Sequence, residues 1–483
     1  ILGGLEASLR RFAHYDYWDD EVKPSILHES GADILSYGMG EKQTAIIAGR
    51  LRAGEEISSL TDIPGTCYMI GSAAGIKGVM LASYEKVKSD KTAYAKSCMF
   101  EHREQDAVRG KLLIQPHGGR FLVQNPPMPP LETKELDAVY ALPYERMYHP
   151  AYESAGGVPA IEEVEFSITH NRGCFGACNF CSLAFHQSRA VTARSPESVL
   201  EEARRIIKNP RFKGYIHDVG GPTANFRYPS CERQKDFGLC ERRKCLAPTP
   251  CGRLIADHTE YLKLLRSLRA LPGVKKVFIR SGIRFDYLML DPDESFFKEL
   301  VAHHISGQLK VAPEHCSREV LYKMGKPPIE TYKKFAMRFY ELTKAFGKEQ
   351  YLVPYLMSSH PGSRLSDAAE LAVFLKRENI RPEQVQDFYP TPGTLSTCMF
   401  YTGLDPETLK PVYVADTPEE KEMQRALLQY FRPENRIKAL KALKLAGRGD
   451  LIGFGSKCLI KPDEKPSRTG TRGARRSRRS GKS

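Results

Sequence analysis

The segment HNRGCFGACNFCSLAFHQSR, residues 170–189, decides the fold, because it places three cysteines on one short glycine-containing loop. Cys174, Cys178 and Cys181 follow a C-x3-C-x2-C spacing, and aromatic Phe180 stands directly before the third cysteine. Three thiolates at this spacing can ligate three irons of a 4Fe–4S cube and leave the fourth iron without a protein ligand. An open iron can bind a further molecule, as the open position of a catalytic zinc does.

Two other metal sites are open alternatives for this loop. A structural zinc site usually has four ligands, and His170 or His186 would have to supply the fourth. A bacterial ferredoxin run has the spacing C-x2-C-x2-C-x3-C, which differs from the one found here. The strand expected before the loop and the helix expected after it favour the open cluster.

On both sides of the loop, short β-rich runs alternate with longer helical patterns. This alternation is typical of a parallel sheet covered by helices. Strands are expected at 161–170, 214–221, 274–282, 306–315, 350–359 and 385–394. Helices are expected at 195–209, 257–271, 294–304, 329–347 and 363–379; Ser195 is the expected N-cap of the first, with Pro196 at its first position. Right-handed crossovers would close these units into a full or partial barrel, with active-site loops at the C-terminal ends of the strands.

Several further stretches resemble one known family over nearly the whole chain, the YgiQ family of radical S-adenosylmethionine (SAM) proteins. The matching stretches are ILGGLEASLRRFAHYDYW (1–18), the cysteine loop, VGGPTAN (219–225), LKVAPEH (309–315), YLVPYLMSSHPG (351–362) and FYTGLDPETLKPVYV (400–414). In this superfamily the open iron binds the methionine amino and carboxylate groups of SAM. Reductive cleavage of SAM then yields a 5′-deoxyadenosyl radical that abstracts hydrogen from the substrate. The resemblance therefore implies a 4Fe–4S cluster, SAM and an electron donor such as a flavodoxin or ferredoxin, but no particular substrate.

The resemblance also suggests which residues contact SAM. The superfamily has a Gly-Gly-Glu motif after the second strand; here Gly220 and Gly221 match, and Pro222 stands in place of the acid. Glycine still lets a ligand approach the backbone closely. The remaining expected SAM contacts lie at the strand ends or on the cluster loop: Phe180, Arg280, Ser281 and Glu314. For each of them, packing at the edge of the core is the competing interpretation.

The expected fold class is α/β: a radical SAM full or partial (βα)6 barrel, a partial Rossmann-like N-terminal domain and a helical C-terminal extension. We expect an N-terminal α/β domain at 1–150, the barrel at 160–400, the helical extension at 401–460 and a disordered basic tail at 461–483. Within the first region, 32–51 is expected to form a strand, a turn and a helix, and 111–130 a hairpin. The chain begins at Ile1, so we expect the first region to be incomplete. It contains no Asp-x-His-x-x-Gly pattern for binding cobalamin, so cobalamin use has no support from the sequence.

A second group of cysteines follows the second expected strand. Cys231, Cys240, Cys245 and Cys251 are spaced C-x8-C-x4-C-x5-C, among several Lys and Arg residues. Four thiolates within one short segment could bind zinc or an auxiliary cluster, and the neighbouring cations would lower their pKa values. Free or packing thiols are the alternative. The other five of the twelve cysteines are scattered through the sequence and are expected to pack as small apolar residues.

The net charge of +14 is concentrated in the C-terminal tail. Residues 461–483 contain nine Lys and Arg against two acids, so they carry half of that excess. No apolar run is long enough to span a bilayer, and no export signal is visible, so we expect a cytoplasmic protein with no membrane partner. The cysteine-rich composition fits a reducing compartment. Nucleic acid is left open as a partner because of the tail alone.

Two rival functions are considered beside the radical SAM enzyme. The first is a zinc- or cluster-containing RNA-binding protein, which the two cysteine groups and the Arg-rich tail would suit. No aromatic–basic alternation or RNA-binding motif accompanies the tail, however. The second is a tRNA-modifying enzyme similar to the methylthiotransferases. These usually add an N-terminal cysteine cluster and a small RNA-binding β-domain, and the sequence shows neither.

Overall fold

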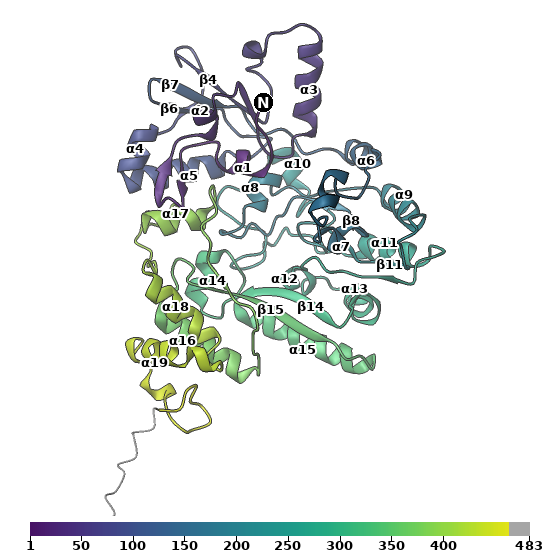
Figure 1. Ribbon diagram of the computed structural model, residues 1–483, viewed down its shortest axis with the longest axis vertical. Coiled ribbons are helices and arrows are strands. Elements are labelled where there is room, and N and C mark those ends of the chain that lie inside the picture. Colours follow the sequence, from purple (N-terminus) through teal and green to yellow (C-terminus); the bar gives the residue numbers. More distant parts are fainter. Residues whose placement is uncertain (463–483) are drawn as a thin grey trace, which may run out of the picture.

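The computed structural model describes residues 1–462 and contains three regions that follow one another along the chain. A sheet-containing N-terminal region lies at the top of Figure 1, the strands and helices of the central region lie below it and to the right, and the last helices lie at the lower left. The positively charged residues 463–483, which hold most of the expected tail, lie outside the described part of the chain. Within residues 1–462, no helix combines the length and apolar character needed to cross a bilayer.

The N-terminal region contains a five-stranded sheet in the order β3-β4-β7-β6-β5. Its strands are β3 (Ile34–Ser36), β4 (Thr66–Ile70), β5 (Val79–Met80), β6 (Leu113–His117) and β7 (Arg120–Gln124). The expected hairpin is β6–β7, turning at Gly118 and Gly119, and both glycines have positive φ angles. The expected strand, turn and helix are β3 and α3 (Glu41–Arg52).

The direction of these strands differs from the Rossmann-like expectation. Three of the four strand pairs are antiparallel, and only β5 and β6 run parallel. A Rossmann-like unit needs helical crossovers between parallel neighbours, whereas β6 and β7 are joined by a tight turn. The other elements of this region are α1 (Gly4–Leu9), β1 (His14–Asp16), β2 (Glu21–Lys23), α2 (Ile26–Ser30), α4 (Tyr84–Ser89), α5 (Lys91–Arg103) and α6 (Thr133–Ala141).

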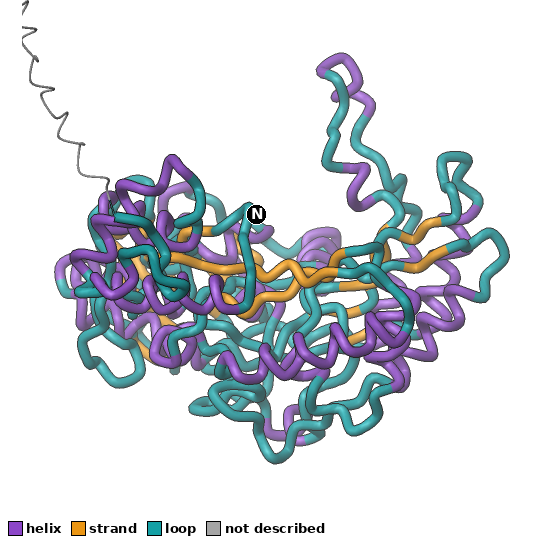
Figure 2. The backbone as a smooth tube through the Cα atoms, turned by 90° about the horizontal axis from the view of Figure 1, so that it is seen from below, coloured by secondary structure: helices purple, strands orange, loops and turns teal. Residues whose placement is uncertain are grey.

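The central region follows the strand and helix alternation expected of the barrel, and the four strand pairs between its units are all parallel. Its strands are β8 (Ser167–Thr169), β11 (Tyr215–Ile216), β12 (Asp218–Gly220), β13 (Lys276–Val277), β14 (Gln308–Glu314), β15 (Tyr351–Ser358) and β16 (Gln386–Asp387). The backbone bond from Val219 N to Phe278 O continues the sheet from β12 to the chain after β13. Figure 2 shows the strands as a band through the middle of the molecule, with helices packed along it.

Helices follow the strands as the sequence pattern predicts. They are α9 (Pro196–Ile207), α11 (Thr259–Arg269), α13 (Ser295–Glu299), α15 (Ile329–Ala345) and α16 (Leu365–Arg377), and the chain after α13 continues through a π-helical turn, Leu300–His304. The Ser195 hydroxyl accepts a hydrogen bond from Ser198 N at 3.1 Å, as an N-cap should. Shorter elements connect these units: α7 (Ile161–Val164), β9 (Asn171–Arg172), α8 (Leu183–Gln187), β10 (Thr192–Ala193), α10 (Arg233–Phe237), α12 (Phe285–Leu288) and α14 (Arg318–Met324).

The first expected strand, 161–170, is correct only in its second half. Ile161–Val164 form α7, and β8 begins at Ser167, where β12 pairs with it. No strand of the described residues pairs with 161–164, and Glu162 and Glu163 stand in the first turn of α7, where acids favour a helix N-terminus.

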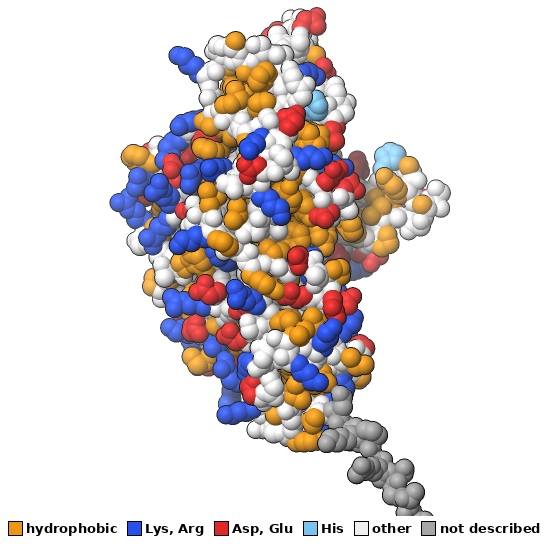
Figure 3. Space-filling model, turned by 90° about the vertical axis from the view of Figure 1, so that its left-hand side faces the viewer, with side chains coloured by type: hydrophobic (Ala, Val, Ile, Leu, Met, Phe, Trp, Pro, Cys, Tyr) orange, Lys and Arg blue, Asp and Glu red, His pale blue; other side chains and the backbone are white. Residues whose placement is uncertain are grey.

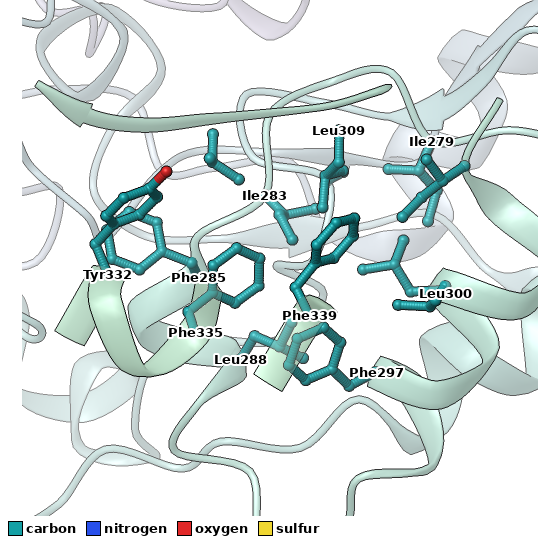
Figure 4. Packing of buried hydrophobic residues seen from close by; sticks show 14 of the residues in the cluster. Ile279, Ile283, Phe285, Leu288, Phe297, Leu300, Leu309, Tyr332, Phe335 and Phe339 are labelled. Carbon is teal, nitrogen blue, oxygen red and sulfur yellow. The ribbon is translucent and has the colours of Figure 1, made fainter. Parts of the chain in front are cut away.

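The main hydrophobic core lies between the barrel strands and these helices. Figure 4 shows Phe285, Phe297, Phe335 and Phe339 gathered beneath the strands. The rings of Phe297 and Phe335 stack with centroids 5.3 Å apart, and Phe285 lies 5.7 Å from Phe335. Phe335 therefore joins side chains from three helices, and it is fully buried.

Replacing Phe335 with Ala is expected to lower the free energy of unfolding by about 3–5 kcal/mol, because it leaves a cavity that the stacked rings cannot fill. Met337 lies on the same helix with 62% of its surface exposed, so Met337→Ala serves as the control, with an expected change within about 0.5 kcal/mol. Denaturant titration of both variants measures the difference. Equal losses in the two variants would contradict this account of the core.

Three helices follow the barrel: α17 (Leu395–Thr402), which packs beside α5 of the N-terminal region, then α18 (Pro418–Leu428) and α19 (Arg436–Leu445). Small and branched side chains of α16, α18 and α19 form a separate core, with Ala368, Ala372, Leu427 and Leu443 fully buried or nearly so. The helices expected in this part of the chain are thus present. On the face drawn in Figure 3, Lys and Arg side chains are densest toward the left-hand edge, and acidic side chains are mixed among them elsewhere.

Candidate active site

The cysteine loop leaves the sheet directly after β8 and is held in a defined backbone conformation. Gly173 has a φ of +81°, and a Cβ there would lie 2.0 Å from Ala190 O, so only glycine fits. Ala177, between the first two cysteines, is also left-handed, with a φ of +46°. Cys174 N donates to Ser188 O at 3.1 Å, and Cys181 N donates to Cys178 O at 3.2 Å. The three cysteines are therefore carried on one tightly turned loop.

A buried ion pair lies against this loop. Arg284 and Asp286 form a bidentate pair, with Nε to Oδ1 at 2.8 Å and Nη2 to Oδ2 at 2.6 Å. The remaining guanidinium nitrogen, Nη1, donates to Cys178 Sγ at 3.3 Å. A Cβ at Gly176 would lie 2.4 Å from the same Nη1, so glycine is needed for the guanidinium to reach the sulfur. A positive charge is thus fixed beside one sulfur of the triad.

The loop is also braced by chain segments that are distant in sequence. Lys244 Nζ donates to Ala177 O at 2.5 Å and also to the side-chain oxygen of Asn179. Asn179 in turn donates through its backbone N to Met324 O and through its side-chain amide to Lys323 O, both at 2.8 Å. Burial lowers the pKa of Lys244 to about 8. These contacts use the polar groups of the loop backbone and leave the cysteine side chains available for ligation.

The three thiols suit a cluster better than a single metal ion. Neither histidine considered as a fourth zinc ligand takes part: His170 Nε2 bonds Ala224 O at 2.8 Å, and His186 Nδ1 bonds Ser8 Oγ at 3.0 Å. Within residues 1–462, no three His, Cys, Asp or Glu side chains lie close enough together to hold one ion. Burial, with Cys178 and Cys174 nearby, raises the pKa of Cys181 to about 12. Iron binding must therefore displace a proton from this thiol.

Two of the expected SAM contacts lie with Cys181 around one cavity of about 660 Å³. Phe180 comes from the loop, and Glu314 comes from the end of β14, where its φ is +67°. Burial raises the pKa of Glu314, although Lys326 Nζ lies 3.7 Å from its carboxylate. Further lining residues come from the loop and from the C-terminal parts of β14, β15 and β16 and the chain that follows: Ser182, Ala312, Tyr355, Met357, Gln386, Asp387, Phe388, Tyr389 and Thr391.

The other expected SAM contacts lie at the end of β12 and in the chain after β13, and they are not among the residues lining this cavity. Ser281 donates through its hydroxyl and its backbone N to the carboxylate of Asp218, which also accepts from Arg280 N. The Arg280 side chain pairs with Glu163 at 3.0 Å near the surface. A Cβ at Gly220 would lie 2.1 Å from Ser281 Oγ, so this glycine lets the two strand ends approach closely. A contact of these residues with SAM stays a prediction.

Gly221 lies against Asn171, a polar side chain that the sequence pattern did not single out. A Cβ at Gly221 would lie 1.9 Å from Asn171 Oδ1, an oxygen that is buried and has no hydrogen-bond partner among the described residues. Thr223, two residues further along, places its hydroxyl 3.5 Å from Cys174 Sγ. Arg284, Asp286 and Lys244 were also missed; the only local signal for the first two is their i, i+2 spacing just after a strand.

The second cysteine group is brought together as well. Cys231, Cys240, Cys245 and Cys251 all line one small cavity beside the loop that carries Lys244. Metal binding by these thiols stays a prediction. The remaining cysteines lie elsewhere in the described chain, and four of those five are buried.

Comparison with protein-family models matches the chain in three consecutive parts. Residues 1–167 match the radical SAM N-terminal model, residues 168–369 match the radical SAM superfamily model, and residues 383–483 match a domain of unknown function, DUF3362. A UPF0313 protein of Clostridium perfringens is 56% identical over 463 residues, covering 95% of this chain and 70% of that protein. One from Clostridium botulinum is 55% identical over 461 residues, covering 95% and 72%.

Among solved structures, similarity is found to TsrM of Kitasatospora setae, a radical S-adenosylmethionine methyltransferase. One TsrM structure, with cobalamin and a [4Fe-4S] cluster bound, has a TM-score of 0.43 and 13% identity, and the match covers 92% of this chain and 82% of that chain. Another, with tryptophan and a SAM analogue, has a TM-score of 0.44 and 15% identity, and covers 82% of this chain and 58% of that chain.

Proposed function

Because this chain belongs to the UPF0313, or YgiQ, family of radical SAM proteins, we propose that it binds a 4Fe–4S cluster through Cys174, Cys178 and Cys181 and cleaves SAM reductively. The observation that carries the proposal is the loop geometry. The three cysteines share one loop, and Cys181 lines a large cavity. The two histidines considered as a fourth zinc ligand, His170 and His186, form hydrogen bonds elsewhere. The rival interpretation as an RNA-binding protein is not favoured by the matched families.

When bound, the cluster supplies the electron that cleaves SAM to methionine and a 5′-deoxyadenosyl radical. The chain itself binds the cluster and SAM, orients them and excludes water. Cys174, Cys178 and Cys181 give up their protons and hold three irons. Arg284 fixes the orientation of the Cys178 sulfur and places a positive charge beside it. Lys244 holds the loop backbone at Ala177 O and so keeps the three sulfurs in fixed positions relative to one another.

The cavity beside Cys181 is the proposed site for SAM and substrate. Phe180 offers an aromatic face against which an adenine ring can pack. Glu314 lines the same cavity, where burial raises its pKa, and Lys326 lies beside it.

The test is an anaerobic assay of the reconstituted chain with SAM and a strong chemical reductant. We expect 5′-deoxyadenosine to form, and we expect a pre-reduced flavodoxin or ferredoxin to be able to replace the chemical reductant. Addition of candidate substrates, with mass measurement of each, then identifies the one that changes. Failure of a fully iron-loaded preparation to produce any 5′-deoxyadenosine would contradict the proposal.

A further inference from the structure

The segment between β12 and α11, residues 221–258, is unusually long for a connection inside a barrel. It contains one five-residue helix, α10 (Arg233–Phe237), and no strand. Connections longer than about 15 residues without structure of their own are uncommon in compact domains and are usually functional. Its apolar anchor is small, with Phe226 and Leu246 packed beside Phe175 of the cysteine loop. Something other than a sheet or a hydrophobic core must stabilise the rest of the segment.

All four cysteines of this segment, Cys231, Cys240, Cys245 and Cys251, line the same cavity, although they span 21 residues. Cys245 is buried, and its sulfur lies 3.2 Å from Ser230 Oγ. Cys251 N donates to Cys245 O at 2.9 Å, which brings the last two cysteines together. None of the four is in a disulfide. Four reduced thiols facing one space form a ligand set without an assigned ligand.

Positive charge surrounds this cavity. Arg233, Arg243 and Lys244 line it together with the cysteines. Arg189, which is nearly fully buried, donates to Cys240 O at 3.0 Å and to Arg243 O at 3.2 Å, and so fixes the backbone on which the cysteines stand. Cations beside thiols favour the thiolate form that binds metal, but the expected lowering of the thiol pKa is not found at Cys245, where burial outweighs Arg189 and raises the pKa. A centre ligated by four thiolates carries net negative charge, which these residues would offset.

We propose that Cys231, Cys240, Cys245 and Cys251 bind a second, auxiliary iron–sulfur cluster. The ligand geometry favours a cluster over zinc. A zinc ion needs its thiolates about 2.3 Å away, and among the described residues no three metal-ligating side chains are placed to hold one ion. The cysteines of a cluster bind separate irons, so their sulfurs can lie farther apart.

The proposed auxiliary cluster would lie beside the loop that carries Cys174, Cys178 and Cys181. Lys244, which directly precedes Cys245, donates to Ala177 O within the cysteine triad. Asp106 of the N-terminal region accepts from Leu239 N at 2.9 Å, and a Cβ at Gly238 would lie 2.3 Å from its carboxylate. The segment is therefore clamped between the two regions, and a cluster there would fix Lys244 against the first loop.

The test uses the full chain with the triad removed, Cys174→Ala/Cys178→Ala/Cys181→Ala, purified and reconstituted anaerobically. We expect this variant to retain about four irons and four inorganic sulfides per chain, with the Mössbauer signature of a cluster. Absence of iron and sulfide, or one zinc in their place, would overturn the proposal. Circular dichroism checks that the variant is folded.

The reciprocal variant, Cys231→Ala/Cys240→Ala/Cys245→Ala/Cys251→Ala, is expected to lose that second cluster and keep the first. Should it fail to fold, adding Cys240→Ala alone to the triad variant is expected to lower its iron content, because Cys240 is exposed and its loss disturbs no core. Unchanged iron in that variant would overturn the assignment of Cys240. Cys458→Ala is the control, with no expected loss. Because the two sites are removed separately, failure of one assignment leaves the other measurable.

Discussion

Replacing Cys174, Cys178 or Cys181 with Ala is expected to abolish reductive SAM cleavage completely, the largest effect that this account predicts. Each cysteine holds one iron of the proposed cluster, and the loop offers no substitute, because the nearby histidines are engaged elsewhere. The iron content should fall by about four per chain in each single variant. Anaerobic iron analysis and quantification of 5′-deoxyadenosine give both results.

Cys458→Ala provides the matched control for this experiment. Cys458 is a free cysteine in the C-terminal part of the chain, so its replacement should leave both iron content and SAM cleavage unchanged. A single triad variant that keeps the full cluster spectrum would remove that cysteine from the ligand set. Loss of activity in Cys458→Ala would show that the assay responds to general damage.

Replacing Arg284 with Met is expected to have the second-largest effect, a loss of about 3–5 kcal/mol in the free energy of unfolding. The change leaves Asp286 as a buried carboxylate without its partner. It also removes the donor to Cys178 Sγ, so the reduction potential of the reconstituted cluster should fall, because a nearby cation stabilises the reduced form. Denaturant titration and a redox titration followed by EPR measure the two effects.

The loss of stability caused by Arg284→Met should depend on pH. Burial alone would raise the pKa of Asp286, but Arg284 outweighs burial and holds that pKa below its ordinary value of 3.8. The pair's contribution is therefore complete at neutral pH and is lost as the pH falls below that value. In Arg284→Met, burial is no longer opposed by Arg284, so Asp286 protonates more readily. The destabilisation should accordingly be smaller at pH 4 than at pH 7.

Arg448 and Asp450 supply a control with the same i, i+2 spacing and the same bidentate geometry, Nε to Oδ1 and Nη2 to Oδ2, both at 2.9 Å. Their side chains are 34% and 60% exposed, against 9% and 3% for the buried pair. Arg448→Met should therefore change stability by less than about 1 kcal/mol and leave the potential unaltered. Equal effects of the two substitutions would show that burial does not determine the role of Arg284.

The parts of the fold that local sequence determines could be predicted. Ser195 and Pro196 mark the start of α9, Gly118 and Gly119 mark the hairpin turn, and each depends on residues close in sequence. The extent of a strand depends on its neighbours instead. Residues 161–164 include the branched apolar side chains Ile161 and Val164, which suit a strand, yet no strand of the described chain pairs with them, and they form a helical turn. The antiparallel order of the N-terminal sheet depends on long-range pairing in the same way.

The candidate site, like the fold, could be predicted where it depends on residues close together in the sequence. The spacing of the three cysteines predicts them as ligands, and the structure places all three on one loop. It could not reveal Arg284, which is separated from Cys178 by more than 100 residues, or Lys244, which approaches Ala177 from another segment. Such contacts form only when the barrel brings its strand ends together. The four cysteines of the second group could be noticed in the sequence, but their convergence on one cavity required the structure.

The measurement that tests the central claim most directly is EPR and ENDOR spectroscopy of the reduced chain with isotopically labelled SAM. If Cys174, Cys178 and Cys181 leave one iron open, the reduced cluster should show hyperfine coupling to ¹⁵N in the amino group and to ¹⁷O in the carboxylate of SAM. The variant lacking the second cysteine group isolates this signal from any auxiliary cluster. Coupling to both nuclei is the predicted result. A reduced cluster with no coupling to SAM in that variant would contradict the account.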